Sequence, residues 1–154
     1  MFIHRDSGNY TPITPAEHAD GTVWIKAKAI DAITAKNPAI LNAASCGWSA
    51  RNITAATASG AWCYVGFPRG TQATSDFDWY QVGGYASQCV FAASVAATAA
   101  IGVKWQSTSI ATAAASTSSS LTLEVGVFGV YATTDSASTA HDIFLHGMMV
   151  QNAG

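Results

Sequence analysis

Hydrophobic and polar positions alternate in several short stretches of the chain, which is the pattern of β-strands with one buried face. The clearest stretches are residues 22–30, 77–82 and 121–131, and residues 61–67 form a short aromatic and apolar run. Turn-forming Gly, Pro, Asn and Ser residues separate these stretches. The pattern predicts one small all-β domain, a barrel or a sandwich.

The stretches between these strands are less regular. Pro38 is followed by Ala, Ile and Leu through residue 44, which predicts a short helix with proline at its start. Gly83 and Gly84 interrupt an extended pattern and predict a bulge or a sharp bend. Residues 94–100 fit a helix by their alanine content and a loop or short edge strand by their flanks.

The second half of the chain contains two polar segments between expected strands. Residues 101–105 and 143–150 are predicted strands. Residues 107–120 are nearly all Ser, Thr and Ala, and residues 132–142 are also polar. Because Ser, Thr and Ala bury little apolar area, residues 107–120 are a predicted surface loop. Residues 132–142 are the predicted loop between the last two strands.

The N-terminal residues lack periodicity and predict an extended arm, residues 1–15, ahead of a β domain, residues 16–154. Pro12 and Pro15 keep such an arm extended. Extended arms bind by laying side chains into a groove or by adding to a sheet edge. We therefore expect the apolar residues of the arm to contact a partner: Phe2, Ile3, Tyr10 and Ile13.

Charged residues make up only 10% of the 154 residues, against roughly a quarter in an ordinary soluble domain. The formal net charge is −2. A surface with so few charges is expected to associate with other proteins. We therefore expect the chain to be a subunit of an assembly and to form a homo-oligomer. The sequence has no basic cluster and no long apolar segment, so we expect no nucleic-acid or membrane partner. The N-terminus does not resemble a secretory signal, which predicts a cytosolic product.

Two groups of residues invite a chemical interpretation. Asp76 and Asp78 lie two apart, as an acid/base pair on a strand would, but their place at a loop edge favours a turn role. His141, Asp142 and His146 suit zinc by type, yet a strand points the two histidines to opposite faces. We therefore expect no enzyme activity, no metal and no cofactor.

Sulfur and aromatic residues favour packing roles. The three cysteines, Cys46, Cys63 and Cys89, are odd in number and irregularly spaced, which predicts free, mostly buried thiols. Cys46, which precedes Gly47, is expected to have a packing role and no catalytic role. Five tryptophans supply the volume that an Ala- and Val-rich core needs. Stacking of these rings on a sugar is the alternative.

Trp79, Gln81 and the Gly83–Gly84 pair are followed by an apolar strand and an Ala-rich step. With this order, residues 61–150 resemble the small β proteins that decorate the heads of tailed bacteriophages. The segments Gly129-Val130-Tyr131-Ala132 and Ile143-Phe144-Leu145 match the closing order of those proteins.

The resemblance implies a β-barrel or β-tulip-like unit that clusters, often as trimers, over joints between major capsid subunits. Its partners would be the major capsid protein and further copies of itself, and it would lie on the outer capsid surface after assembly in the host cytoplasm. It brings no catalytic residues. The alternative function is a carbohydrate-binding or adhesion module of a phage tail or cell surface.

Overall fold

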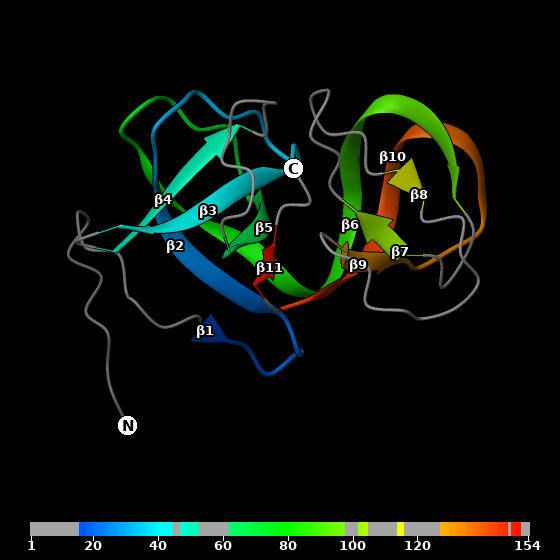
Figure 1. Ribbon diagram of the computed structural model, residues 1–154, viewed down its shortest axis with the longest axis horizontal. Helices are drawn as coiled ribbons and strands as arrows, with labels where there is room; N and C mark the ends of the chain where they lie inside the picture. Colours follow the sequence, from blue (N-terminus) through cyan, green and yellow to red (C-terminus); the bar gives the residue numbers. More distant parts are fainter. Residues whose placement is uncertain are drawn as a thin grey trace.

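A computed structural model describes residues 16–44, 47–52, 62–97, 102–104, 114–115, 127–147 and 149–151 of the chain (Figure 1). The regular structure of these residues is entirely β, which confirms the predicted fold class. The strands are β1 (Ala16–Glu17), β2 (Val23–Ala29), β3 (Ala39–Ala44), β4 (Gly47–Asn52), β5 (Trp62–Pro68), β6 (Phe77–Ala97), β7 (Gly102–Lys104), β8 (Ala114–Ala115), β9 (Val127–Tyr131), β10 (Asp135–His146) and β11 (Val150–Gln151).

Five of these strands close into a barrel. The strands pair in the order β2-β4-β3-β5-β6, and β6 pairs again with β2. The β2–β4 pair is parallel, and the other pairs of the barrel are antiparallel. Closure gives each of the five strands a hydrogen-bonded neighbour on both sides, so the barrel leaves no long open edge.

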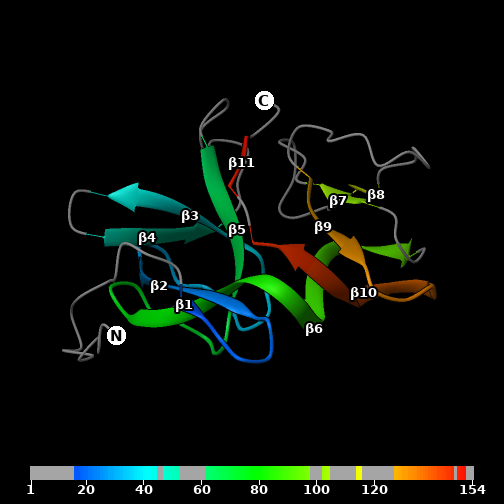
Figure 2. The same cartoon turned by 90° about the horizontal axis from the view of Figure 1, so that it is seen from below.

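The second half of the molecule is a sheet built on the continuation of β6. Beyond the barrel β6 pairs with β10, which is followed by β9, β7 and β8. The two halves lie side by side in Figure 1, and the view in Figure 2 shows β6 running from one into the other. The short strands β1 and β11 pair with β2 and β5.

Two hydrophobic cores follow from this arrangement. One core, inside the barrel, contains Ile25, Ala27, Ala29, Ile33, Ala39, Leu41, Trp48, Ala50, Tyr80 and Val82. The other lies between the barrel wall and the second sheet and contains Ile40, Cys63, Val65, Phe67, Ala86, Cys89, Val103, Phe128, Tyr131, Ile143 and Leu145. Strand β5 separates the cores, which explains why its sequence is an almost continuous apolar run.

The paired glycines of β6 form the corner between the two halves, as the sequence predicted. The register with β2 shifts here, because Val23 pairs with Gly83 whereas Trp24 pairs with Gln81. Gly84 has a φ of +80°, a left-handed conformation that a residue with a Cβ adopts only at a cost. A bulge of this kind bends a strand and increases its twist.

The helix predicted for residues 38–44 is wrong, because Ala39–Ala44 is strand β3. Ile40 faces the core between the sheets, whereas Ala39 and Leu41 face the barrel interior. Consecutive side chains thus enter the two cores alternately, and this period of two is that of a strand. Pairing with β4 and β5 therefore overrides the weak helical preference of the local sequence.

Two predicted loops also differ from the structure. Residues 132–142 were expected to be a loop, but β10 begins at Asp135. Its first half is polar because it is largely exposed, and it forms a ribbon with the far end of β6, where Asp135 pairs with Ala97. Within the predicted loop 107–120, the described residues Ala114–Ala115 form β8, which pairs with β7. Pairing with another strand, which periodicity does not reveal, decides both cases.

The remaining expected strands occupy shorter or shifted ranges. The ambiguous segment 94–100 is strand as far as Ala97, the end of β6. Strand β7 lies within residues 101–105, and β9 forms the end of residues 121–131. Residues 143–150 include the end of β10 and the start of β11. The arm, residues 1–15, lies outside the described residues.

Candidate functional site

A β-bulge shapes the outer face of the β6–β10 pair. Ala86 pairs with Ile143 and Cys89 pairs with His141, so two residues of β6 stand opposite the single residue Asp142 of β10. One of the two, Gln88, has a φ of 57°, in the left-handed region. Bulges of this type redirect side chains and backbone groups locally.

The bulge supplies hydrogen bonds to the Asp142 carboxylate. The backbone N–H of Gln88 donates to Oδ1 of Asp142 over 2.9 Å, and the Tyr85 hydroxyl donates to Oδ2. These two hydrogen bonds hold the pKa of Asp142 below its ordinary value, and the bond from Tyr85 has the larger effect. The hydrogen bond between Tyr85 and Asp142 also raises the pKa of Tyr85, because it favours the protonated phenol.

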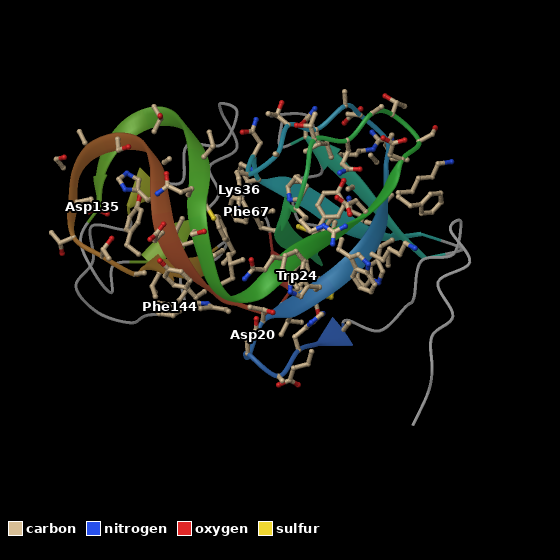
Figure 3. The ribbon with its side chains drawn as sticks, turned by 180° about the vertical axis from the view of Figure 1, so that it is seen from behind. Asp20, Trp24, Lys36, Phe67, Asp135 and Phe144 are labelled. Atoms are coloured by element: carbon tan, nitrogen blue, oxygen red, sulfur yellow. The ribbon has the colours of Figure 1, made fainter. Side chains whose placement is uncertain are left out.

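Two aromatic rings stand beside this carboxylate on the same exposed face. Tyr85 pairs directly with Phe144 across the strands, and their ring centroids lie 5.4 Å apart at 61°. The two residues are 47% and 48% exposed, although both are large and apolar. Figure 3 shows Phe144 on β10, in the half of the molecule away from the barrel. We call Tyr85, Phe144 and Asp142 the aromatic patch.

Rigid packing lies beneath the aromatic patch. His141, Ile143 and Leu145 alternate with the exposed residues of β10 and are buried. The His141 ring meets the Tyr131 ring edge-on at 5.4 Å. The patch is therefore set on strands whose other face packs in the core, which fixes the backbone positions of its residues.

The sequence did not single out Tyr85 or Phe144 as site residues. The available signal is that Phe144 stands between Ile143 and Leu145, so an apolar residue occupies the position that alternation assigns to solvent. Asp142 was considered only as a metal ligand. His141 is buried and His146 is exposed, which confirms that they face opposite sides of the strand. No group of three metal-binding side chains occurs among the described residues.

A second group of aromatic residues lies on the outside of the barrel. Three cross-strand pairs between β2 and β6 share this outer face: Trp24 with Gln81, Lys26 with Trp79, and Lys28 with Phe77. Both tryptophans are half-buried, whereas Lys26 is 5% exposed. The Lys28 Nζ lies 5.9 Å from the centroid of the Phe77 ring, within cation–π range. We call these six residues the tryptophan face.

Two side chains of the tryptophan face donate hydrogen bonds to residues nearby in the sequence. Trp24 Nε1 donates to Oγ1 of Thr22 over 2.8 Å, and Gln81 Nε2 donates to the Tyr85 carbonyl over 2.7 Å. Figure 3 shows Trp24 where β2 crosses β6. Trp48 is buried instead, and it meets Tyr64 edge-on with the ring centroids 5.5 Å apart. The packing role expected for tryptophan therefore applies to Trp48.

The two aspartates considered for catalysis have structural partners. Oδ2 of Asp76 accepts from the backbone N–H of Ala73, three residues earlier, over 2.9 Å, which is a turn role as expected. Oδ2 of Asp78 accepts from Gln72 Nε2 over 2.6 Å. Arg69 lies 3.7 Å from the other oxygen of Asp78. Both carboxylates therefore hold the loop before β6 in shape.

Cys63 and Cys89 are buried and form no disulfide within the described residues, which confirms the prediction for these two; Cys46 lies outside the described residues. Burial raises the pKa of Cys63 to about 11 and that of Cys89 to about 12. Thiols held protonated are poor nucleophiles.

Across the described part of the chain, no helix is long and apolar enough to cross a membrane. Searches of protein-family models, of curated proteins and of solved structures give no match to this chain.

Proposed function

We propose that the protein is a structural virion subunit that binds the outer surface of a phage capsid and stabilises joints between its major subunits. The observation that supports it best is the aromatic patch, two large rings exposed on a chain with only 10% charged residues. Exposed aromatic residues set on a rigid sheet are typical anchors of protein–protein contacts. The resemblance to head-decoration proteins supports the same function.

The mechanism in this proposal is binding without chemistry. Contacts that bridge neighbouring capsid subunits add free energy that opposes the pressure of packaged DNA. An oligomer, with a trimer favoured, engages several sites at once and gains avidity through effective concentration. The major capsid protein and further copies of this chain are the proposed partners, and the outer capsid surface is the proposed location.

Cosedimentation tests the proposal. Capsids of the encoding phage, assembled without this protein, are mixed with purified protein over a concentration series. We expect saturable binding at a stoichiometry that matches the capsid symmetry, together with a higher temperature of capsid disruption. Absence of binding at micromolar concentration would exclude the role.

The N-terminal arm is the proposed main contact with the capsid. Deleting residues 1–14 removes its four apolar contact residues, Phe2, Ile3, Tyr10 and Ile13, and leaves every described strand in place. We expect the truncated protein to fold and to bind capsids more weakly. Full occupancy by the truncated protein would place the contact on the β domain instead.

Carbohydrate binding is the second candidate, and the tryptophan face favours it. Trp24 and Trp79 lie on one outer face with Phe77, Lys28 and Gln81, and flat rings beside polar groups suit the faces of a sugar. Electrophoresis in gels that contain defined polysaccharides measures carbohydrate binding as retardation of the protein. If the tryptophan face binds sugar, Trp24→Ala and Trp79→Ala abolish the retardation, whereas the core variant Trp48→Phe is still retarded.

A further inference from the structure

The aromatic patch combines two features that together recognise one kind of side chain. Its rings present electron-rich faces, and its carboxylate carries a negative charge. A cation above an aromatic ring gains energy from the ring quadrupole. A carboxylate beside the ring adds a charge-assisted hydrogen bond for the same cation. The pair suits a basic group better than an apolar one.

The carboxylate retains capacity for a further partner. Each oxygen of Asp142 accepts one hydrogen bond, from Tyr85 and from Gln88, and an ionised carboxylate has about four acceptor sites. Within the described residues, no lysine or arginine forms an ion pair with Asp142. The two hydrogen bonds orient the carboxylate, and no lysine or arginine in that part of the chain neutralises its charge.

We propose that Tyr85, Phe144 and Asp142 bind the guanidinium group of an arginine on the surface of a different protein. A guanidinium is planar, so it stacks on a ring, and its paired N–H groups match the two oxygens of a carboxylate. Lysine offers a point charge without the plane. The site deepens the proposed function by naming a contact for the partner, but it requires only a protein surface, not a capsid.

Charge favours a different protein over a second copy of this chain. The chain has only seven Lys and Arg residues and a formal net charge of −2. The described part contains two arginines: Arg69, which lies 3.7 Å from Asp78 of its own chain, and Arg51, which is exposed. The patch therefore complements a more basic surface than this chain itself offers.

Nuclear magnetic resonance titration tests the site without knowledge of the partner. The probe is N-acetylarginine N-methylamide, and the control is the citrulline analogue, which has the same shape and no charge. We expect saturable shifts of the Tyr85, Phe144 and Asp142 signals with the arginine probe, at an affinity about tenfold higher than with citrulline, corresponding to about 1.4 kcal/mol.

Three variants separate binding from folding. Asp142→Asn retains an acceptor for Tyr85 and is expected to weaken the arginine probe about tenfold. Phe144→Leu removes a ring at a position that is 48% exposed, and it is expected to weaken the probe as well. Asp135→Asn removes another exposed carboxylate of β10 and serves as the matched control, with no change expected.

Several outcomes overturn the proposal. Equal shifts with arginine and citrulline, or an unchanged affinity in Asp142→Asn, exclude a guanidinium site. Sedimentation of the free protein tests whether the arginine comes from a second copy of this chain. Self-association that Asp142→Asn abolishes would show that it does, and would refute the proposal of a different protein. Arginine binding without capsid binding would leave this site in place and reject the capsid role, and the reverse result would reject only the site.

Discussion

Replacing Gly84 by alanine tests the corner through which β6 leaves the barrel. A Cβ at this position would lie 2.7 Å from the Gly21 carbonyl oxygen and 3.0 Å from the Thr22 Cα. Both atoms belong to the backbone, and ordinary contact begins near 3.4 Å. The chain on one side of the corner must therefore move by several tenths of an ångström.

Three contributions set the expected magnitude. The left-handed φ of +80° costs alanine about 1–2 kcal/mol. Overpacking against backbone costs about 1–3 kcal/mol more. The lower entropy of the unfolded alanine chain offsets about 0.4–1 kcal/mol. We expect Gly84→Ala to lower the free energy of unfolding by about 2–4 kcal/mol, a large part of the stability of a typical domain.

Gly21→Ala is the matched control. Gly21 has nearly the same φ, +78°, but its added Cβ would meet nothing within 4 Å. Only the two conformational contributions apply there, so the expected loss is about 0–1.6 kcal/mol. The difference between the two variants measures the contact at the corner alone.

Urea unfolding followed by tryptophan fluorescence measures both variants. The midpoint should fall much further for Gly84→Ala than for Gly21→Ala, with an unchanged dependence on urea concentration. If the two variants unfold within about 0.5 kcal/mol of each other, the close approach of Gly84 to residues 21–22 does not exist in solution, and the account of the corner is wrong.

Three further predictions concern buried and charged groups. The Tyr80 hydroxyl is buried and has no hydrogen-bond partner in the described part, so Tyr80→Phe should leave the free energy of unfolding unchanged or raise it by about 1 kcal/mol; a clear loss in urea unfolding would reveal a partner. In a Cys46→Ser variant, Cys63 and Cys89 should resist Ellman's reagent at pH 8 until the protein unfolds, because burial raises their pKa to about 11 and about 12; rapid reaction of the native protein would contradict their burial. The pKa of Asp142 is lowered in the folded state, so its contribution to stability is complete above the unfolded value of about 3.9 and is lost as the pH falls through the folded pKa. Thermal unfolding from pH 6 to pH 2 should therefore depend less steeply on pH in Asp142→Asn than in the natural chain, and parallel curves would exclude this linkage.

The sequence by itself determined the strands whose alternation is set by one buried face. Residues 22–30 and 77–82 pair as β2 and the start of β6, and the glycines at 83–84 form the bend that their flexibility predicted. The turn role of Asp76 was also readable, because its hydrogen bond spans only three residues. These features depend on local chemistry, so a local pattern is sufficient to predict them.

Only the tertiary structure decided the rest. Strand β3 looked helical because burial on both faces leaves no alternation of apolar and polar residues, and the polar half of β10 looked like a loop because it is largely exposed. The aromatic patch depends on the register of β6 and β10, which places Tyr85 opposite Phe144, 59 residues later in the sequence, and the bulge opposite Asp142. Register is a property of the paired strands, and a shift of one residue would turn these side chains to the other face.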